Sequence, residues 1–320
     1  MSWNVFVTRR IPQPGLDLIN EHCDNVEINQ EDRVLTHDEL LEGVRGRDGV
    51  LCLLTDTIND DVFDAAGPQC KVFANYAVGY NNIDIEAAKQ RDIRITNTPG
   101  VLTDATADMA WALLFSAARR IVESDRFMRT GRWQGWGPMQ FLGQDITGAT
   151  LGVIGGGRIG ANFALKSAGF GMNVLYADPN RNEELEEAVG ATRVEMDDLL
   201  KQADFVSIHV PLMPETTHLI GERELSLMKP NAVLINTSRG PVVDEKALLA
   251  ALKEERIAAA GLDVYEEEPK AVEGLADLPN VVMCPHIASA TVATRTKMAL
   301  MAAENLLAVL RGEQPPNPVV

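Results

Sequence analysis

The chain has 320 residues and a formal net charge of −17 at pH 7, with 46% hydrophobic and 23% charged residues. This length is enough for two domains, and the composition is that of a soluble globular protein. The negative charge argues against nucleic acid and anionic membrane surfaces as partners, so an anionic ligand would need a locally positive site such as a buried arginine.

The first hundred residues contain short apolar runs that are typical of strands. These runs are "NVFVT" (4–8), "GVLCLL" (49–54), "KVFANY" (71–76) and "RITNTP" (94–99). Helical patterns lie between them, and in "THDELLEGV" Thr36 is placed to cap the first turn. Pro99 and Gly100 then interrupt the chain ahead of a long helical segment from about Thr103 to Thr130. The alternation of strands and helices predicts a parallel sheet covered by helices.

A second series of strands and helices begins at "TLGVIGGG" (150–157). Its further strands are expected at 173–178, 205–210, 232–237, 258–264 and 281–285. A last helix, from about Val292 to Leu310, cannot extend the second sheet, so we expect it to cross back to the first section. The prediction is two doubly wound α/β domains with a cleft between them. One is discontinuous, 1–101 plus 291–320, and the other, 102–290, is inserted into it.

The cysteines and the first residues of the chain indicate the cellular compartment. Cys23, Cys52, Cys70 and Cys284 are scattered and form no CxxC pair, which favours reduced thiols in a cytoplasmic protein. The first residues have the pattern of a strand rather than of a signal peptide, and the longest apolar run is about half a membrane span. A reactive thiol at Cys284, close to His286, remains an alternative to simple packing.

A glycine-rich loop opens the second series. Gly155, Gly157 and Gly160 have G-x-G-x-x-G spacing between an apolar strand and a helix, and Asp178 ends the next strand. Glycine lets the backbone approach a pyrophosphate, which the helix N-terminus binds through free N–H groups. The pattern therefore predicts a dinucleotide site. Asp178 favours NAD over NADP because it repels a 2′-phosphate, although Arg181 would reach such a phosphate if its loop turned.

Three further side chains that follow strands suit the chemistry of 2-keto acids. Arg239 lies in "INTSRGPVVDE", Glu268 ends the acidic run of "GLDVYEEEP", and His286 lies in "CPHIASAT". Arginine holds a carboxylate with its planar fork, and imidazole delivers a proton to a carbonyl oxygen. A carboxylate beside the ring orients it and favours its protonated form. Each residue alone is compatible with a surface charge, a solvated loop or a buried ring, but together with the glycine loop they predict hydride transfer.

The chain resembles the D-isomer-specific 2-hydroxyacid dehydrogenases over essentially its whole length. The resemblance is carried by "VGYNNID" (78–84), "GVIGGGRIG", "VSIHVPLMPETTHLI" (206–220), "MKPNAVLINTSRGPVVDEKALLAAL" (228–252), "GLDVYEEEP" and "CPHIASAT". The segment "GRWQGWGPMQFLG" (131–143) is most similar to the glyoxylate and hydroxypyruvate reductases of the family. The resemblance implies a flavodoxin-like substrate-binding domain, a Rossmann NAD-binding domain, and reduction of glyoxylate or hydroxypyruvate to the D-2-hydroxy acid, with NADH preferred over NADPH.

The resemblance also implies roles for individual residues. The expected catalytic residues are Arg239, Glu268 and His286. Substrate contacts are expected from Leu54, Val78, Gly79, Trp136, Arg239, His286 and Ser289. Cofactor contacts are expected from Thr106, Gly155, Gly157, Arg158, Ile159, Gly160, Asp178, Val210, Pro211, Thr216, Thr237, Ser238, Arg239, Asp263, His286, Ala288 and Ser289. Asp263 would take the nicotinamide carboxamide, and no metal is expected.

Several alternatives remain open. The resemblance implies a homodimer formed around the segment that begins near Thr103, where Trp136 either reaches the partner subunit's pocket or only packs at the interface. Lactate-type and phosphonate-oxidising relatives share the catalytic residues. Phosphoglycerate dehydrogenases with an added regulatory domain, and formate dehydrogenases with glutamine in place of Glu268, are less expected. The alternative from another class is a non-enzymatic, NAD-sensing corepressor.

Overall fold

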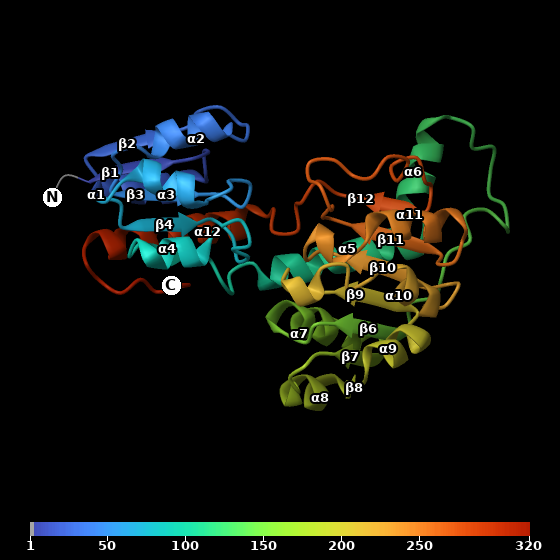
Figure 1. Ribbon diagram of the computed structural model, residues 1–320. Helices are drawn as coiled ribbons and strands as arrows, with labels where there is room; N and C mark the ends of the chain where they lie inside the picture. Colours follow the sequence, from blue (N-terminus) through green and yellow to red (C-terminus); the bar gives the residue numbers. More distant parts are fainter. Residues whose placement is uncertain (1–2) are drawn as a thin grey trace. The chain divides into compact units, whose positions relative to one another are not determined.

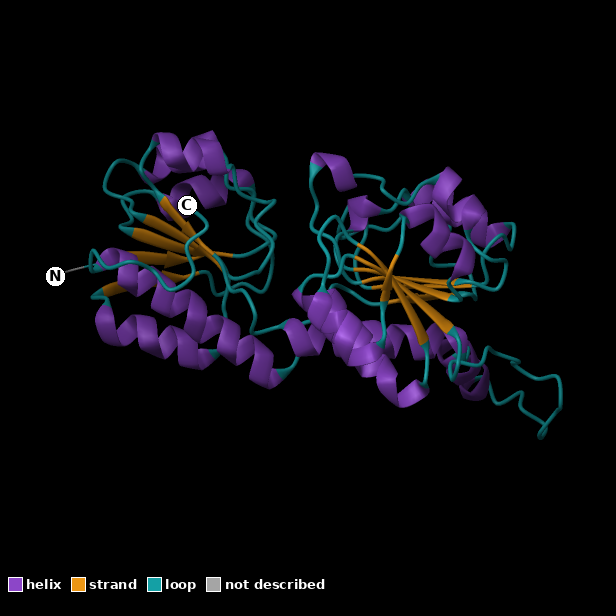
Figure 2. Ribbon diagram, turned by 90° about the horizontal axis from the view of Figure 1, so that it is seen from below, coloured by secondary structure: helices purple, strands orange, loops and turns teal. Residues whose placement is uncertain are grey.

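The computed structural model describes residues 3–320. The chain divides into two compact units, Met1–Leu102 with Ala290–Val320, and Thr103–Ser289. Each unit has one parallel sheet with helices on both faces, as Figures 1 and 2 show. The predicted fold class of two parallel-sheet α/β units is confirmed. Their assignment as substrate-binding and dinucleotide-binding domains remains a prediction.

The sheet of the first unit has the strand order β2-β1-β3-β4-β5, a flavodoxin-like arrangement. Its strands are β1 (Asn4–Val7), β2 (Asn25–Ile28), β3 (Gly49–Cys52), β4 (Val72–Asn75) and β5 (Arg94–Thr96). The sequence did not reveal β2, whose residues "NVEI" are partly or fully exposed at the sheet edge. An edge strand needs no continuous apolar run, and this run is what identified the four fully or mostly buried strands.

Helices cover both faces of this sheet. They are α1 (Gln13–His22), α2 (His37–Val44), α3 (Asp60–Ala66), α4 (Ile85–Gln90) and α12 (Val292–Leu310). The closing helix α12 packs on β3, β4 and β5 and against α1, as expected for a segment that returns to the first unit. The approach is close, since a Cβ at Gly15 would lie 2.7 Å from Ala299 Cβ. Thr36 caps α2 as predicted, accepting from Glu39 N at 3.3 Å.

The sheet of the second unit has the order β12-β11-β10-β9-β6-β7-β8, with all strands parallel. Its strands are β6 (Thr150–Ile154), β7 (Asn173–Ala177), β8 (Thr192–Arg193), β9 (Phe205–Ile208), β10 (Val233–Asn236), β11 (Ala259–Leu262) and β12 (Val281–Met283). The chain runs outward from β6 to β7 and β8, then returns to β9 on the other side of β6. Ligands of doubly wound sheets bind at such a switch point, beyond the carboxyl ends of the strands.

Alternate residues of these strands face two helical layers. Val153, Phe205 and Ile235 pack with helices α5 (Thr103–Ala118), α7 (Arg158–Leu165) and α8 (Glu183–Val189). Ile154, Val206 and Leu234 pack with α9 (Met196–Gln202), α10 (Glu222–Leu227) and α11 (Glu245–Lys253). Short 3-10 helices lie at Lys166–Phe170, Pro214–Thr216 and Gly240–Val242. Among the helices of residues 3–320, none has the length and hydropathy that crossing a bilayer requires.

The predicted helical segment 103–130 is broken in the structure. Helix α5 ends at Ala118, and α6 (Ile121–Arg129) begins after Arg120, whose φ is +53°. The chain comes back to the end of α5 after residue 143, where Gln144 N donates to Ala118 O at 2.9 Å. Helix α6 has no buried residue, and the loop after it exposes Trp136 and Met139, at 85% and 77%. We call residues 121–143 the arm.

Candidate functional site

The predicted dinucleotide residues lie at the carboxyl edge of the second sheet. Six of the seven strands are followed by at least one of them: Gly155 after β6, Asp178 after β7, Val210 after β9, Thr237 after β10, Asp263 after β11 and His286 after β12. Because the strands are parallel, these ends lie along one edge, on both sides of the switch point between β6 and β9 (Figure 1).

Two glycines of the loop are closely packed against neighbouring backbone, and the third has free space around it. Gly155 has φ +95°, and a Cβ there would lie 2.9 Å from the backbone of His209. A Cβ at Gly160 would lie 1.9 Å from Gly155 O. A Cβ at Gly157 would meet nothing within 4 Å, and Gly157 is exposed at the N-terminus of α7. No side chain among residues 3–320 caps α7, so the N–H groups of its first turn are available to a pyrophosphate.

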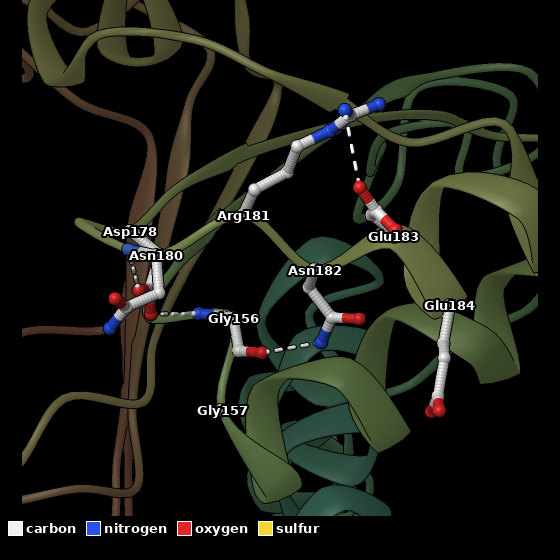
Figure 3. Close-up of a pocket in the computed structure, with 8 residues that line it drawn as sticks. All are labelled: Gly156, Gly157, Asp178, Asn180, Arg181, Asn182, Glu183 and Glu184. Carbon is white, nitrogen blue, oxygen red and sulfur yellow. Dashed lines mark hydrogen bonds and ion pairs between the residues drawn. The ribbon is translucent and has the colours of Figure 1, made fainter.

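Asp178 fixes this loop from the next strand. Its Oδ2 accepts from Gly156 N at 2.8 Å and its Oδ1 accepts from Asn180 N at 2.8 Å, while Asn182 Nδ2 donates to Gly156 O at 2.8 Å. Figure 3 shows these bonds around a pocket of about 530 Å³. The pocket is lined by Gly156, Gly157, Asp178, Asn180, Arg181, Asn182, Glu183 and Glu184.

Arg181 is paired with acidic residues of α8. Its Nη2 lies 2.7 Å from Glu186 Oε2 and its Nη1 lies 3.4 Å from Glu183 Oε1. The guanidinium holds the pKa of Glu186 below its ordinary value, and Tyr176 OH donates to the same carboxylate at 2.7 Å. A 2′-phosphate in this pocket would therefore face the carboxylates of Asp178, Glu183 and Glu184, with the nearby arginine already paired.

Further along the edge, His286 and Glu268 form a hydrogen-bonded pair. His286 Nδ1 lies 2.9 Å from Glu268 Oε2 and 3.1 Å from Oε1, and Tyr265 N donates to Oε1 at 3.2 Å. Burial alone would raise the pKa of Glu268, but the hydrogen bonds from His286 and Tyr265 N and the charges of His286 and Arg239 together outweigh it, so that this pKa lies below its ordinary value. Because Nδ1 is engaged by an ionised carboxylate, Nε2 is the ring atom placed to exchange a proton.

Asp263 holds the turn that carries the histidine. His286 has φ +54°, a left-handed conformation that costs free energy for a residue with a Cβ. Asp263 O accepts from His286 N at 2.8 Å, and the Asp263 carboxylate accepts from Ile287 N and Ala288 N, each at 2.7 Å. Asp263 is completely buried, which raises its pKa. These bonds support the strained turn; the predicted carboxamide contact of Asp263 remains a prediction.

Arg239 lies in the loop after β10. It is next to the loop of residues 263–272, which contains Glu268 and which we call the glutamate loop. Its O accepts from Asn236 Nδ2 at 3.0 Å, and its Nη1 donates to Ser238 O at 2.8 Å. A Cβ at Gly240 would lie 1.8 Å from the backbone of Tyr265, so only glycine permits this approach of the two loops. Burial lowers the pKa of Arg239 while the charge of Glu268 opposes this, and the guanidinium remains a cation at neutral pH.

The other predicted cofactor residues of this unit lie in the same loops or at the starts of α5 and α7. Thr216 Oγ1 donates to Pro211 O at 2.7 Å, and Ser238 Oγ donates to Asn236 Oδ1 at 2.8 Å. Thr237 Oγ1 is buried and has no hydrogen-bond partner within residues 3–320, as a group that awaits a ligand would be. The remainder are Thr106, Arg158, Ile159, Val210, Ala288 and Ser289.

The predicted substrate contacts are more dispersed. Arg239 and His286 are brought to one sheet edge, together with Glu268. Leu54, Val78 and Gly79 belong to the first unit, where they follow β3 and β4. Trp136 lies in the exposed arm. The roles of these four residues remain predictions.

Sequence reasoning missed the buried carboxylate that braces the glutamate loop. Glu245, at the start of α11, is 4% exposed; its Oε1 accepts from Glu266 N at 2.8 Å and its Oε2 from Val272 N at 2.9 Å. The only signal was the acidic pair "DE" at the helix start, which equally fits capping by Asp244. Asn182 was also missed, because an N-cap residue gives no sign that its amide reaches Gly156.

The chain is similar to known proteins over nearly its whole length. Residues 111–288 match the family model described as D-isomer specific 2-hydroxyacid dehydrogenase, NAD binding domain. The chain is 52% identical to a glyoxylate reductase of Thermococcus litoralis, over 99% of this chain and 96% of that one. A glyoxylate reductase structure from Paecilomyes thermophila is 31% identical, with a TM-score of 0.88 over 99% and 98% of the two chains. An NADPH-dependent glyoxylate/hydroxypyruvate reductase of Sinorhizobium meliloti, in complex with NADP and malonate, is 32% identical, with a TM-score of 0.86 over 100% and 97%.

Proposed function

The chain belongs to the D-isomer-specific 2-hydroxyacid dehydrogenases, and on this premise we propose that it reduces glyoxylate to glycolate with a reduced nicotinamide cofactor. The family and the enzyme class predicted from the sequence are confirmed. Hydroxypyruvate, which would give D-glycerate, is the second substrate of the proposal, because it differs from glyoxylate only in the group beyond the reacting carbonyl.

The observation that carries the proposal is the His286–Glu268 pair at the sheet edge, with Arg239 in the adjoining loop. Arg239 binds the substrate carboxylate through its planar fork. His286 gives the proton at Nε2 to the carbonyl oxygen, while Glu268 holds Nδ1 and thereby fixes the ring. The bound cofactor supplies a hydride to the carbonyl carbon. Together the hydride and the proton convert the 2-keto acid into the 2-hydroxy acid.

The cofactor would occupy the carboxyl edge from the glycine loop towards His286. Gly155, Gly157 and Gly160 fit a pyrophosphate, since their backbone leaves the N-terminus of α7 open. Asp178 would accept hydrogen bonds from the adenosine ribose. The other residues proposed to line the cofactor are Thr106, Arg158, Ile159, Val210, Pro211, Thr216, Thr237, Ser238, Arg239, Asp263, His286, Ala288 and Ser289.

We propose that NADH is preferred over NADPH. Asp178, Glu183 and Glu184 give the ribose pocket a negative wall, and Arg181 is paired with Glu186. The Sinorhizobium meliloti relative is NADPH-dependent, so we infer that local residues of this pocket, rather than the fold, set the preference. The arm, with exposed Trp136, is proposed as part of a homodimer interface, and a cytoplasmic location remains a prediction.

The deciding experiment follows the absorbance of NADH at 340 nm with a panel of 2-keto acids. Glyoxylate and hydroxypyruvate should be reduced faster than pyruvate or bulkier acids, and NADPH should support a lower kcat/KM than NADH. Cofactor binding without any turnover across the panel would contradict the proposed reaction. Chiral analysis of the product from hydroxypyruvate would test the D configuration.

A further inference from the structure

Three consecutive peptide carbonyls that follow β4 in the first unit are each held by a hydrogen bond. Ala77 O accepts from Thr98 N at 2.9 Å, Val78 O accepts from Asn97 Nδ2 at 2.8 Å, and Gly79 O accepts from Asn75 Nδ2 at 3.0 Å. Two of the three donors are side-chain amides, and they act on the two residues for which the family resemblance implies substrate contact.

These bonds dictate where the neighbouring N–H groups point. In a trans peptide the C=O of one residue and the N–H of the next point in opposite directions. The N–H groups of Gly79 and Tyr80 are therefore directed away from Asn97 and Asn75. Within residues 3–320, the N–H groups of Val78, Gly79 and Tyr80 donate to no protein acceptor. Unpaired backbone N–H groups are donors available to an anion, and successive N–H groups in a turn are a common way for proteins to bind one.

The two asparagines are themselves fixed by separate parts of the unit. Asn75 is completely buried, and its Nδ2 also lies 3.4 Å from Asn82 Oδ1. Asn82 in turn donates to Leu53 O at 3.1 Å, in the loop after β3. On the other side, Asn97 O accepts from Asn305 Nδ2 of α12 at 3.0 Å. The orientation of the 78–80 peptides thus depends on both the β3 loop and the closing helix.

We propose that Asn97 and Asn75 are positioning residues that aim the backbone N–H groups of Gly79 and Tyr80 at the carboxylate of the 2-keto acid. This inference rests on the proposed function, because it assumes that an anionic substrate binds at this loop. The asparagines do not touch the substrate. They keep the peptides from rotating, so that the N–H groups meet the carboxylate without a reorganisation cost.

The test uses Asn97, which is only half-buried, and a matched control. Asn97→Leu removes the donor at nearly constant size, and Asn97→Asp removes it while keeping a polar group. Asn29 is also half-buried, and its Nδ2 donates to a backbone carbonyl, Thr8 O, at 3.1 Å, so Asn29→Leu is the control. Both Asn97 variants should raise the KM for glyoxylate about tenfold, the effect of one lost hydrogen bond to a charged group. The Kd for NADH should stay within about twofold, and Asn29→Leu should retain the wild-type KM.

Three outcomes would overturn the inference. An unchanged KM in folded Asn97→Leu would show that the amide does not aim the loop. A rise confined to Asn97→Asp would assign the effect to charge repulsion rather than to position. The third readout does not depend on activity: a crystal structure of Asn97→Leu should show the Val78–Gly79 peptide rotated, and an unrotated peptide refutes the inference. Failure of the wild type to reduce any 2-keto acid would instead refute the proposed function.

Discussion

His286 Nδ1 and Glu268 Oε2 lie 2.9 Å apart, although 18 positions separate the residues in the chain. Two buried carboxylates hold this pair in place through hydrogen bonds to the backbone of the loops that carry it. Glu245 binds the loop that contains Glu268, and Asp263 binds the turn that contains His286. Neither carboxylate is expected to move a proton, but the pair depends on both.

Replacement of His286 by alanine should lower kcat at least about a hundredfold, because it removes the group proposed as the proton donor. NADH should still bind to this variant, which fluorescence titration would show. His22→Ala is the control, since His22 is exposed and its Nδ1 lies 3.0 Å from Leu18 O of its own helix. A kcat equal to that of the wild type would exclude His286 as the acid–base.

Replacement of Arg239 by alanine should raise the KM for glyoxylate and lower kcat together, because the guanidinium acts on the bound substrate and on the charge that develops in the transition state. Arg239→Lys should recover only part of kcat/KM, since an ammonium cannot form the bidentate pair. Steady-state kinetics with both variants checks this. Normal kinetics in Arg239→Ala, with only a lower Tm, would assign the residue to stability alone.

Two glycines of the same loop should respond to alanine in different ways. Gly160→Ala places a Cβ 1.9 Å from Gly155 O and should lower the Tm strongly or prevent folding. Gly157→Ala meets nothing in the protein and should leave the Tm within a few degrees, yet weaken NADH binding about tenfold or more, because the Cβ occupies the space proposed for the pyrophosphate. Thermal unfolding and NADH titration of the two variants test this. Unaltered NADH affinity in Gly157→Ala would place the phosphates elsewhere.

Asp178→Asn should shift the cofactor preference towards NADPH. The change removes one of the three carboxylates that face the ribose pocket and keeps an acceptor for Gly156 N. We expect the ratio of kcat/KM for NADPH to that for NADH to rise about tenfold. Glu187→Gln removes the same charge from an exposed position of α8 that does not line the pocket, and it should leave the ratio unchanged. Equal ratios in the two variants would contradict the assignment.

His209 should make the second unit sensitive to acid. Burial lowers the pKa of His209 from its ordinary 6.5 to about 3, and its Nε2 lies 2.9 Å from Ser207 Oγ. Below pH 6.5 His209 binds a proton in the unfolded chain but not in the folded chain. The contribution of His209 to stability is therefore fully present above pH 6.5 and is lost as the pH falls towards 3. The free energy of unfolding falls by at most about 1.4 kcal/mol for each pH unit through this one group. His209→Gln should flatten the fall in Tm between pH 7 and 5, whereas His22→Gln should not; an unaltered slope in His209→Gln would disprove the assignment.

The sequence could predict those parts of the fold that leave a local pattern. The buried strands and the helix at Val292–Leu310 were foreseen because continuous apolar runs and helical periodicity mark them. The short edge strands β2 and β8 were not, since half-exposed residues carry no such run. The break between α5 and α6 was not predicted; it coincides with a distant contact, from Gln144 N to Ala118 O, that no local pattern marks.

For the candidate site, residue types that carry their own chemistry were identified from motifs, and His286 does meet Glu268 as expected. The residues that hold them were not identified. Glu245, Asn97 and Asn75 act through bonds to backbone atoms, and nothing in an isolated sequence marks which peptide an amide or carboxylate will reach.

The return of α12 to the first sheet has a consequence for biosynthesis. Residues 103–289 emerge from the ribosome as one uninterrupted segment that contains all seven strands of their sheet, so this unit can fold while translation continues. The strands β3, β4 and β5 precede the second unit and must wait for α12, which covers them and is synthesised after that unit. Until then their apolar face is open to chaperones or to aggregation, and the first unit becomes native later than the unit that is inserted into it.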